Sequence, residues 1–186
     1  SRRIGLLVEQ LLEAAKLDAG QVTMNVENFP IGELLQDVVQ KFALAARDCG
    51  VALEVDAMAA ATMVSGDIAL LERVLDNLID NALRHTPIGG RVTVQSQPRG
   101  ERVRIAVTDS GPGLTREEAE RAFERFYRGD PGRSTQSGQS GLGLAIVKSI
   151  LELHGSDVAV ESQPGHGASF YFELPIVTQP PRTAPT

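Results

Sequence analysis

The sequence lacks the features that several protein classes need. It has no tryptophan, and its single cysteine, Cys49, cannot form an internal disulfide. One cysteine fits a reducing cytoplasm better than a disulfide-stabilised secreted domain. No apolar run approaches the roughly 18 residues that a membrane span requires, and the N-terminus lacks the apolar core of a signal peptide. We therefore expect a fold built without disulfides and without a membrane span of its own.

Basic charge is also scarce. The 186 residues include 18 Lys and Arg against 24 Asp and Glu, which gives a formal net charge of −6. Nucleic-acid binding favours a basic surface, so this balance argues against a nucleic-acid partner. With 42% hydrophobic and 23% charged residues, the composition predicts one globular domain with appendages. The sequence begins with Ser rather than Met, so we expect a piece of a longer protein, with any membrane anchor outside it.

The N-terminal segment predicts an amphipathic helix that ends near Gly20. Its apolar residues recur at helical spacing: Ile4, Leu7, Val8, Leu11, Leu12 and Ala15. Such a stripe is typical of a helix packed on its own domain. It is equally typical of half a helical hairpin that dimerises, and the pattern alone leaves both interpretations open.

The rest of the chain mixes helices and strands without strict βαβ alternation, which predicts an α+β two-layer sandwich. Asp67 is a good N-cap for a long helix, and a Pro/Thr-rich tail, 177–186, is expected to be disordered. In chain order we expect strand 21–29, helix 31–48, strand 51–56, helix 67–84, a hairpin of "GGRVTVQSQ" and "RVRIAVTD", helix 117–123, helix 142–154, and strands "DVAVESQ" and "ASFYFELP".

The helix that starts at Asp67 has two sides of different character. Leu71, Leu75, Leu78 and Ala82 should face the core, whereas the polar side carries Asn77, Asn81, Arg84 and His85. Asparagine is a mediocre helix former, so a pair one turn apart needs a reason. The polar side is either a solvated face or a face for metal and phosphate. In the second interpretation an amide oxygen suits Mg²⁺, and Arg84 offsets phosphate charge.

The segment "RIAVTDSGPGL" is a hydrophobic strand that ends at Asp109 and enters a sharp turn. Taken alone, it is a plain turn, since Asp-Ser-Gly-Pro is turn chemistry. In the functional interpretation, Gly111 and Gly113 bring the backbone close to a ligand. Asp109 then accepts a hydrogen bond from an exocyclic amine such as that of adenine, and rejects the carbonyl of guanine.

A polar stretch from Arg128 to Ser140 ends in "GQSGLGLA" and leads into a helix. Gly138 and Gly143 have Walker A spacing, but Leu144 replaces its Lys and Ala145 its Ser or Thr. A dinucleotide-binding motif also fails, because Ile146 stands where a third glycine is needed. A long polar loop of this kind is either disordered or a functional lid, and the free N–H groups at the helix start favour an anion.

Together the motifs carry a family resemblance. In order, "LDNLIDNALRHTP", "DSGPGL", "FERFYR", "GQSGLGLAIVK" and "GHGASFYFELP" resemble the N, G1, F, G2 and G3 boxes of sensor histidine kinases. These kinases share an ATP-binding superfamily with gyrase, MutL and the ninety-kilodalton heat-shock chaperone. The resemblance covers residues 27–175. It implies a Bergerat-type fold, a mixed and mainly antiparallel sheet with helices on one face.

The resemblance also implies residue roles. Asn81 matches the Mg²⁺ ligand, and Asn77 stands where gyrase-like members carry a general-base Glu. Arg84 matches a phosphate contact, His85 a pocket position, and Asp109 the adenine-reading carboxylate. Further ATP contacts are expected from the lid and both glycine boxes, with Arg133 as a looser match in the lid: Gly111, Gly113, Arg128, Gly138, Ser140, Gly141, Leu142, Gly143 and Leu144. Asn77, Asn81 and Arg84 are the expected catalytic residues, and ATP and Mg²⁺ the expected cofactors.

Three regions follow from the resemblance. Residues 1–20 are expected to end a dimerisation and phosphotransfer helix, 21–176 to form the catalytic domain, and 177–186 the tail. The family's phosphoacceptor motif is absent, since none of His85, His154 and His166 has its context. His154 and His166 are expected to be structural or solvated.

The implied activity is transfer of the γ-phosphoryl group of ATP to a histidine on a separate region, for relay to a response regulator. The implied full-length protein is a membrane-anchored homodimer with this part in the cytoplasm. One alternative is a non-catalytic, nucleotide-gated interaction module. Another is an ATPase of the gyrase or MutL kind, which Asn77 disfavours.

Overall fold

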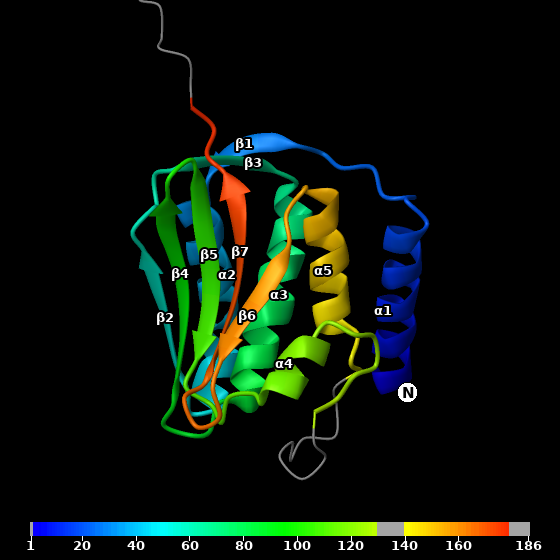
Figure 1. Ribbon diagram of the computed structural model, residues 1–186, viewed down its shortest axis with the longest axis vertical. Helices are drawn as coiled ribbons and strands as arrows, with labels where there is room; N and C mark the ends of the chain where they lie inside the picture. Colours follow the sequence, from blue (N-terminus) through cyan, green and yellow to red (C-terminus); the bar gives the residue numbers. More distant parts are fainter. Residues whose placement is uncertain (1, 130–139, 179–186) are drawn as a thin grey trace, which may run out of the picture.

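The structure, a computed structural model, describes residues 2–129 and 140–178. A five-stranded sheet forms one layer, and α2 (Ile31–Asp48), α3 (Ile68–His85) and α5 (Gly143–Leu153) cover one of its faces (Figure 1). The N-terminal helix α1 (Arg2–Asp18) stands beyond α5, away from the sheet. The short helix α4 (Arg116–Arg121) crosses the end of the layers. This arrangement confirms the predicted two-layer α+β sandwich with helices on one face.

The main sheet is mixed and mostly antiparallel, as predicted. Its strand order is β2-β4-β5-β7-β6, with β2 parallel to β4 and every other pair antiparallel. The strands are β2 (Ala52–Ala57), β4 (Arg91–Arg99), β5 (Arg102–Asp109), β6 (Val158–Ser162) and β7 (Ala168–Pro175). Alternate residues of β4 and β5 are buried, so one face of this sheet meets the helices. Asp109 is consequently placed at the end of a central strand.

The starts of α3 and α4 follow capping chemistry in the sequence. The side chain of Asp67 accepts the N–H of Leu70 at 3.0 Å and begins α3. Thr115 and Glu118 form a reciprocal capping box at α4. Both caps fix where a helix begins, and α3 is the helix that carries the predicted polar face.

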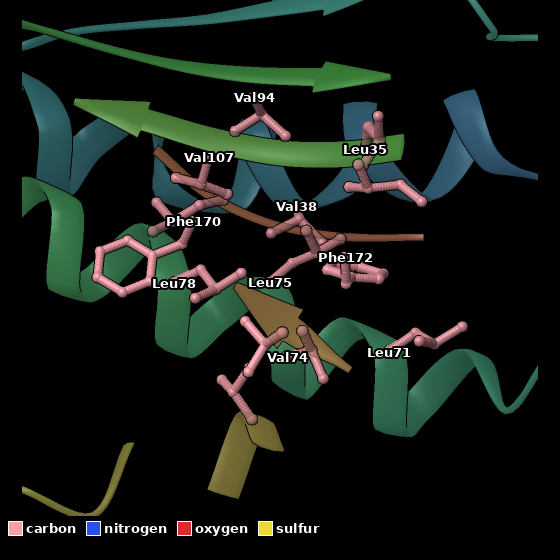
Figure 2. Packing of buried hydrophobic residues seen from close by; sticks show 14 of the residues in the cluster. Leu35, Val38, Leu71, Val74, Leu75, Leu78, Val94, Val107, Phe170 and Phe172 are labelled. Carbon is pink, nitrogen blue, oxygen red and sulfur yellow. The ribbon is translucent and has the colours of Figure 1, made fainter. Parts of the chain in front are cut away.

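The core lies between the sheet and its helices. Figure 2 shows Leu75 and Leu78 of α3 on the side of the helix that faces Phe170 and Phe172 of β7. The predicted apolar side of α3 is confirmed: Leu71, Leu75, Leu78 and Ala82 are all buried. Burying a side chain of this size stabilises the fold by roughly 1.5–3 kcal/mol. Because the apolar side is committed to the core, the polar side of α3 must face the opposite way.

Two strand predictions need correction. Only Glu27–Pro30 of the predicted strand 21–29 is a strand, β1, and it pairs with an unpredicted strand, β3 (Met63–Gly66). Asn25 instead donates its backbone N–H to Asp67 Oδ2 at 2.8 Å, so this bond is not available to a ladder. Alternation marks side-chain exposure but not which backbone groups find a strand partner.

Helix α1 packs only part of its apolar side on the domain. Ala14 and Leu17 are buried next to α5, so its last turns pack on the domain. Most of the predicted stripe is nevertheless exposed: Ile4, Leu7, Val8, Leu11 and Leu12. That α1 belongs to a dimerising hairpin stays a prediction. The predicted tail, 177–186, lies largely outside the described residues.

Candidate functional site

Two adjoining pockets form the candidate site, at the end of the sheet where β5 stops. The first is lined by His85, Asp109, Pro112, Gly113, Leu114, Glu118, Gly129, Ala168, Phe170 and the shared residues below. The second is lined by Leu6, Leu7, Gln10, Asn77, Asp80, Arg84, Ser140, Gly141, Gly143 and the same shared residues. Residues common to both are Asn81, Ala122, Tyr127, Arg128 and Leu144. The pockets are therefore two parts of one cleft, which we call the cleft below.

Asp109 lies in the first pocket as a buried acceptor. Asp109 is only 7% exposed, and its Oδ1 accepts the backbone N–H of Gly111 at 2.8 Å. Burial raises the pKa of this carboxyl, against the backbone N–H groups of Gly111 and Ala168, which lower it. A carboxylate in this position can accept a hydrogen bond from a ligand inside the pocket.

His85 lines the same pocket from the end of α3. Burial lowers the pKa of its imidazole, the Asp109 charge opposes that shift, and the Arg84 charge adds to it. The neutral ring therefore predominates at pH 7, which suits contact with an uncharged ring of a ligand.

The loop after Asp109 is braced by the turn between β6 and β7. Gly113 has a φ of +70°, and a Cβ there would lie 2.1 Å from the carbonyl oxygen of Gln163. Gly167 has a φ of +74°, and its Cβ would lie 1.9 Å from the carbonyl oxygen of Asp109. No side chain fits at either position. Sequence reasoning marked the turn that contains Gly167 but missed that this residue positions Asp109.

The polar side of α3 faces the cleft. Asn81 is 9% exposed and lines both pockets, so it is not part of a solvated face. Asn77 lines the second pocket and donates its side-chain N–H to the carbonyl of Arg73 at 3.0 Å. Arg84 lines the same pocket but pairs with Asp80 at 2.8 Å. Sequence reasoning missed Asp80, although its spacing four residues before Arg84 is a recognised signal.

The glycine-rich segment enters the cleft at the start of α5. Ser140, Gly141 and Gly143 line the second pocket, and Leu144 lines both. A Cβ on Gly143 would lie 3.2 Å from Asn77 Oδ1, so the helix start approaches the α3 amide closely. The segment is held at its base, because Phe126 donates its N–H to the carbonyl of Gly141 at 2.8 Å.

Two predicted ATP contacts, Leu142 and Gly111, do not line the cleft. Leu142, the N-cap of α5, is fully buried, with 0% exposure. Gly111 lines neither pocket, and instead holds Asp109 through its N–H. Gly138 and Arg133 lie outside the described residues.

Aromatic and apolar groups complete the first pocket. Tyr127 lines both pockets, and the Arg121 guanidinium lies 4.3 Å from its ring centroid. Arg128 also lines both pockets, as the sequence predicted. The quoted motif "FERFYR" contains Tyr127, but sequence reasoning did not single out these lining residues: Pro112, Leu114, Glu118, Ala122, Tyr127, Gly129, Ala168 and Phe170. Most come from separate elements, and only the fold brings them together.

Comparison with known families shows which family the chain belongs to. Residues 66–178 match the family described as histidine kinase-, DNA gyrase B- and HSP90-like ATPase. The chain belongs to this family. The matched region contains all the described lining residues except Leu6, Leu7 and Gln10 of α1.

The curated relatives are named as sensor-like histidine kinases or sensor proteins. The chain is 36% identical over 179 residues to the sensor-like histidine kinase SenX3 of Mycobacterium tuberculosis, covering 96% of this chain and 43% of that protein. It is 37% identical to the sensor protein DivL of Caulobacter vibrioides, over 93% of this chain and 22% of that protein. This chain thus spans less than half the length of these relatives. Their names confirm the resemblance to sensor histidine kinases.

Solved structures agree. Full-length ShkA in complex with AMPPNP matches with a TM-score of 0.81 and 30% identity, over 93% of this chain and 36% of that chain. Histidine kinase ThkA in complex with the response regulator protein TrrA matches with a TM-score of 0.76 and 26% identity, over 95% of this chain and 48% of that chain. The fold is that of histidine kinase catalytic domains. Within residues 2–129 and 140–178, no helix is long and apolar enough to cross a membrane.

Proposed function

We propose that the chain binds Mg·ATP in the cleft and transfers its γ-phosphoryl group to a histidine on the dimerisation domain of the same kinase. The observation that carries this proposal is Asn81, a nearly buried amide that lies between the pocket of Asp109 and the pocket of Arg84. Asp109, which would bind adenine, and Arg84, which would contact phosphate, therefore lie on opposite sides of the Asn81 amide, which would bind the metal. ATP has the same order of base, metal-bound phosphates and terminal charge.

In this proposal the first pocket holds the base. Asp109 accepts a hydrogen bond from the exocyclic amine of adenine, and the neutral His85 and apolar Leu114 and Phe170 supply surface for the ring. Guanine presents a carbonyl at that position, which a carboxylate repels. ATP is thereby preferred over GTP.

The second pocket holds the phosphates. Asn81 offers an amide oxygen, and in the part of the chain that the structure describes no group of three or more His, Cys, Asp or Glu can hold a metal ion. That donor set fits Mg²⁺, which usually binds through one or two protein oxygens together with substrate phosphates and water. Bound there, Mg²⁺ would neutralise phosphate charge. Exposed pairs such as Arg84–Asp80 are weak, so Arg84 can turn to a phosphate.

The transferred group leaves ADP and bonds to an imidazole nitrogen of the acceptor. Such transfer depends mainly on positioning and charge stabilisation, so the domain needs no covalent residue of its own. The amide of Asn77 cannot take a proton from an attacking water, which disfavours a hydrolase. The response regulator and homodimer partners remain part of this proposal, as does the membrane-anchored, cytoplasmic location. The ThkA–TrrA complex supports the regulator.

The test uses Asn81→Asp with a separately supplied phosphotransfer domain and labelled ATP. We expect the unmodified chain to label the acceptor and the variant to lose Mg²⁺-dependent labelling while remaining folded. Asn28→Asp, an equivalent change in β1 and outside the cleft, serves as the matched control. Equal labelling by Asn81→Asp would refute the metal role. Nucleotide binding without any labelling would favour the interaction module, and steady hydrolysis without an acceptor would favour the ATPase.

A further inference from the structure

His154 lies outside the cleft. It joins α3 and α5, the two helices that carry most of the polar groups of the cleft. It caps the C-terminus of α5 and is half-buried. Its Nε2 lies 3.1 Å from the backbone nitrogen of Asp67, and its Nδ1 lies 2.9 Å from the carbonyl oxygen of Ile150. Because the Asp67 N–H donates to Nε2, the ring proton sits on Nδ1 and donates to Ile150. The ring therefore bonds the end of α5 to the start of α3.

The surroundings of His154 hold the ring in this position. A Cβ added to Gly66 would lie 3.1 Å from its Cδ2 and 3.2 Å from its Nε2, so the ring packs against that backbone. Asp67 is itself anchored, since its carboxylate accepts the N–H of Leu70 at 3.0 Å and that of Asn25 at 2.8 Å. The backbone N–H that meets His154 thus belongs to a residue fixed by two further hydrogen bonds.

The same two helices meet again beside the cleft. Gly143 opens α5 and approaches the side-chain amide of Asn77 on α3. At 1.5 Å per residue, about 15 Å of α3 separates Asp67 from Asn77, and about 16 Å of α5 separates Gly143 from His154. The two fixed points are therefore spaced almost equally along both helices. A shift of α5 along α3 cannot occur at one point without the other.

From this relationship we propose that His154 is a positioning residue for the cleft. Its bond to Asp67 sets the axial register of α5 on α3. That register sets where Gly143 and the N–H groups at the start of α5 lie relative to Asn77 and Asn81. The effect on catalysis rests on the proposed kinase function, whereas the register does not.

The test of register uses ligand-free protein and two-dimensional NMR. His154→Leu removes the acceptor, and His154→Gln keeps a side-chain oxygen that can accept from Asp67. Ser156→Ala is the matched control, because Ser156 donates its hydroxyl to the carbonyl of Glu173 at 2.7 Å and ties the same end of α5 to β7 instead. We expect the Gly143 amide and the Asn77 side-chain signals to move in His154→Leu only.

Gly66→Ala provides a second route if His154→Leu does not fold. It keeps His154 and crowds the ring, with its Cβ 3.1 Å from Cδ2, and it also crowds Leu71 Cδ1 at 2.7 Å. It should move the same signals. A lower melting temperature of His154→Leu with unmoved Gly143 and Asn77 signals would overturn the proposal. His154 would then be a helix cap that only stabilises the fold. Equal shifts in Ser156→Ala would overturn it too.

The consequence for function is measured separately. Loss of one hydrogen bond changes an equilibrium constant by roughly fivefold. We therefore expect the KM for Mg·ATP to rise about fivefold in His154→Leu. In His154→Gln the KM should return to the value of the unmodified chain. Unchanged kinetics beside shifted NMR signals would contradict the link from register to catalysis. If the unmodified chain does not bind ATP at all, the proposed function fails, and the NMR result still decides the register.

Discussion

The guanidinium of Arg73 on α3 donates hydrogen bonds to both carboxylate oxygens of Glu13 on α1. Arg73 Nε lies 3.2 Å from both carboxylate oxygens, and Nη2 lies 2.8 Å from Oε2. The pair is part-buried, and the Glu13 hydrogen bond raises the pKa of Arg73. This contact and the Arg125–Asp18 ion pair join α1 to the domain beside the cleft.

A double-mutant cycle should detect this contact. Because the pair is only part-buried and solvent screens it, we expect Glu13→Gln and Arg73→Gln to show a coupling of about 0.5–1 kcal/mol in the free energy of unfolding, falling with added salt. The exposed Lys41–Glu72 pair between α2 and α3 is the matched control and should couple more weakly. No measurable coupling at low salt would mean that the contact does not hold α1 in solution.

Asp109→Asn should weaken ATP binding and stabilise the ligand-free fold. Hydrogen bonds to charged groups contribute about 1.5–3 kcal/mol, so the Kd for ATP should rise roughly tenfold or more. The amide N–H₂ can donate to guanine, so preference for ATP over GTP analogues should shrink. Calorimetric titration with both analogues measures this change, and equal Kd values for wild type and variant would remove Asp109 from base recognition.

The pH dependence of that variant follows from the sign of the pKa shift. Burial raises the pKa of Asp109 above the ordinary value of 3.8. Ionisation of Asp109 therefore lowers the free energy of unfolding. This loss is absent below pH 3.8, grows as the pH rises to the raised pKa, and stays constant above it. The gain in melting temperature from Asp109→Asn should be largest near neutral pH and shrink toward pH 3.8. A gain independent of pH would contradict the burial argument.

Gly167→Ala should damage the cleft far more than Gly165→Ala. Both glycines have positive φ, +74° and +83°, so each alanine carries backbone strain of roughly 1–3 kcal/mol. Only at Gly167 would the Cβ also collide with the Asp109 carbonyl, whereas nothing lies within 4 Å at Gly165. Chemical denaturation and ATP-analogue titration should show Gly165→Ala as a pure strain variant and Gly167→Ala as one that also loses binding. Equal losses in both would locate the effect in strain alone.

Gly143→Ala tests the contact between α5 and Asn77. A new methyl group would lie 3.2 Å from Asn77 Oδ1, so the amide must shift. Gly5→Ala in α1 is the control, because nothing lies within 4 Å there and alanine favours a helix by up to about 1 kcal/mol. We expect Gly5→Ala to stabilise slightly and Gly143→Ala to raise the Kd for Mg·ATP. Unchanged affinity in Gly143→Ala would show that Asn77 has room to move.

Local signals in the sequence predicted several elements and showed which polar residues of α3 share one side of the helix. Capping at Asp67, the apolar period of Leu71, Leu75 and Leu78, and the strand ending at Asp109 are local signals, and each predicted its element. The spacing of Asn77, Asn81, Arg84 and His85 placed them on one helix side, and the structure directs that side to the cleft. Local periodicity suffices here because helix geometry alone brings such residues together.

Contacts between distant segments depend on how the layers pack. Gly167 lies against the backbone of Asp109, and His154 bonds Asp67 across a sequence separation of 87 residues. No local sequence pattern pairs these residues. The fate of residues 21–26 was decided in the same way, because Asn25 bonds Asp67 instead of a strand. Backbone groups take whichever partner the packed layers bring within reach. Side-chain periodicity carries no information about that choice.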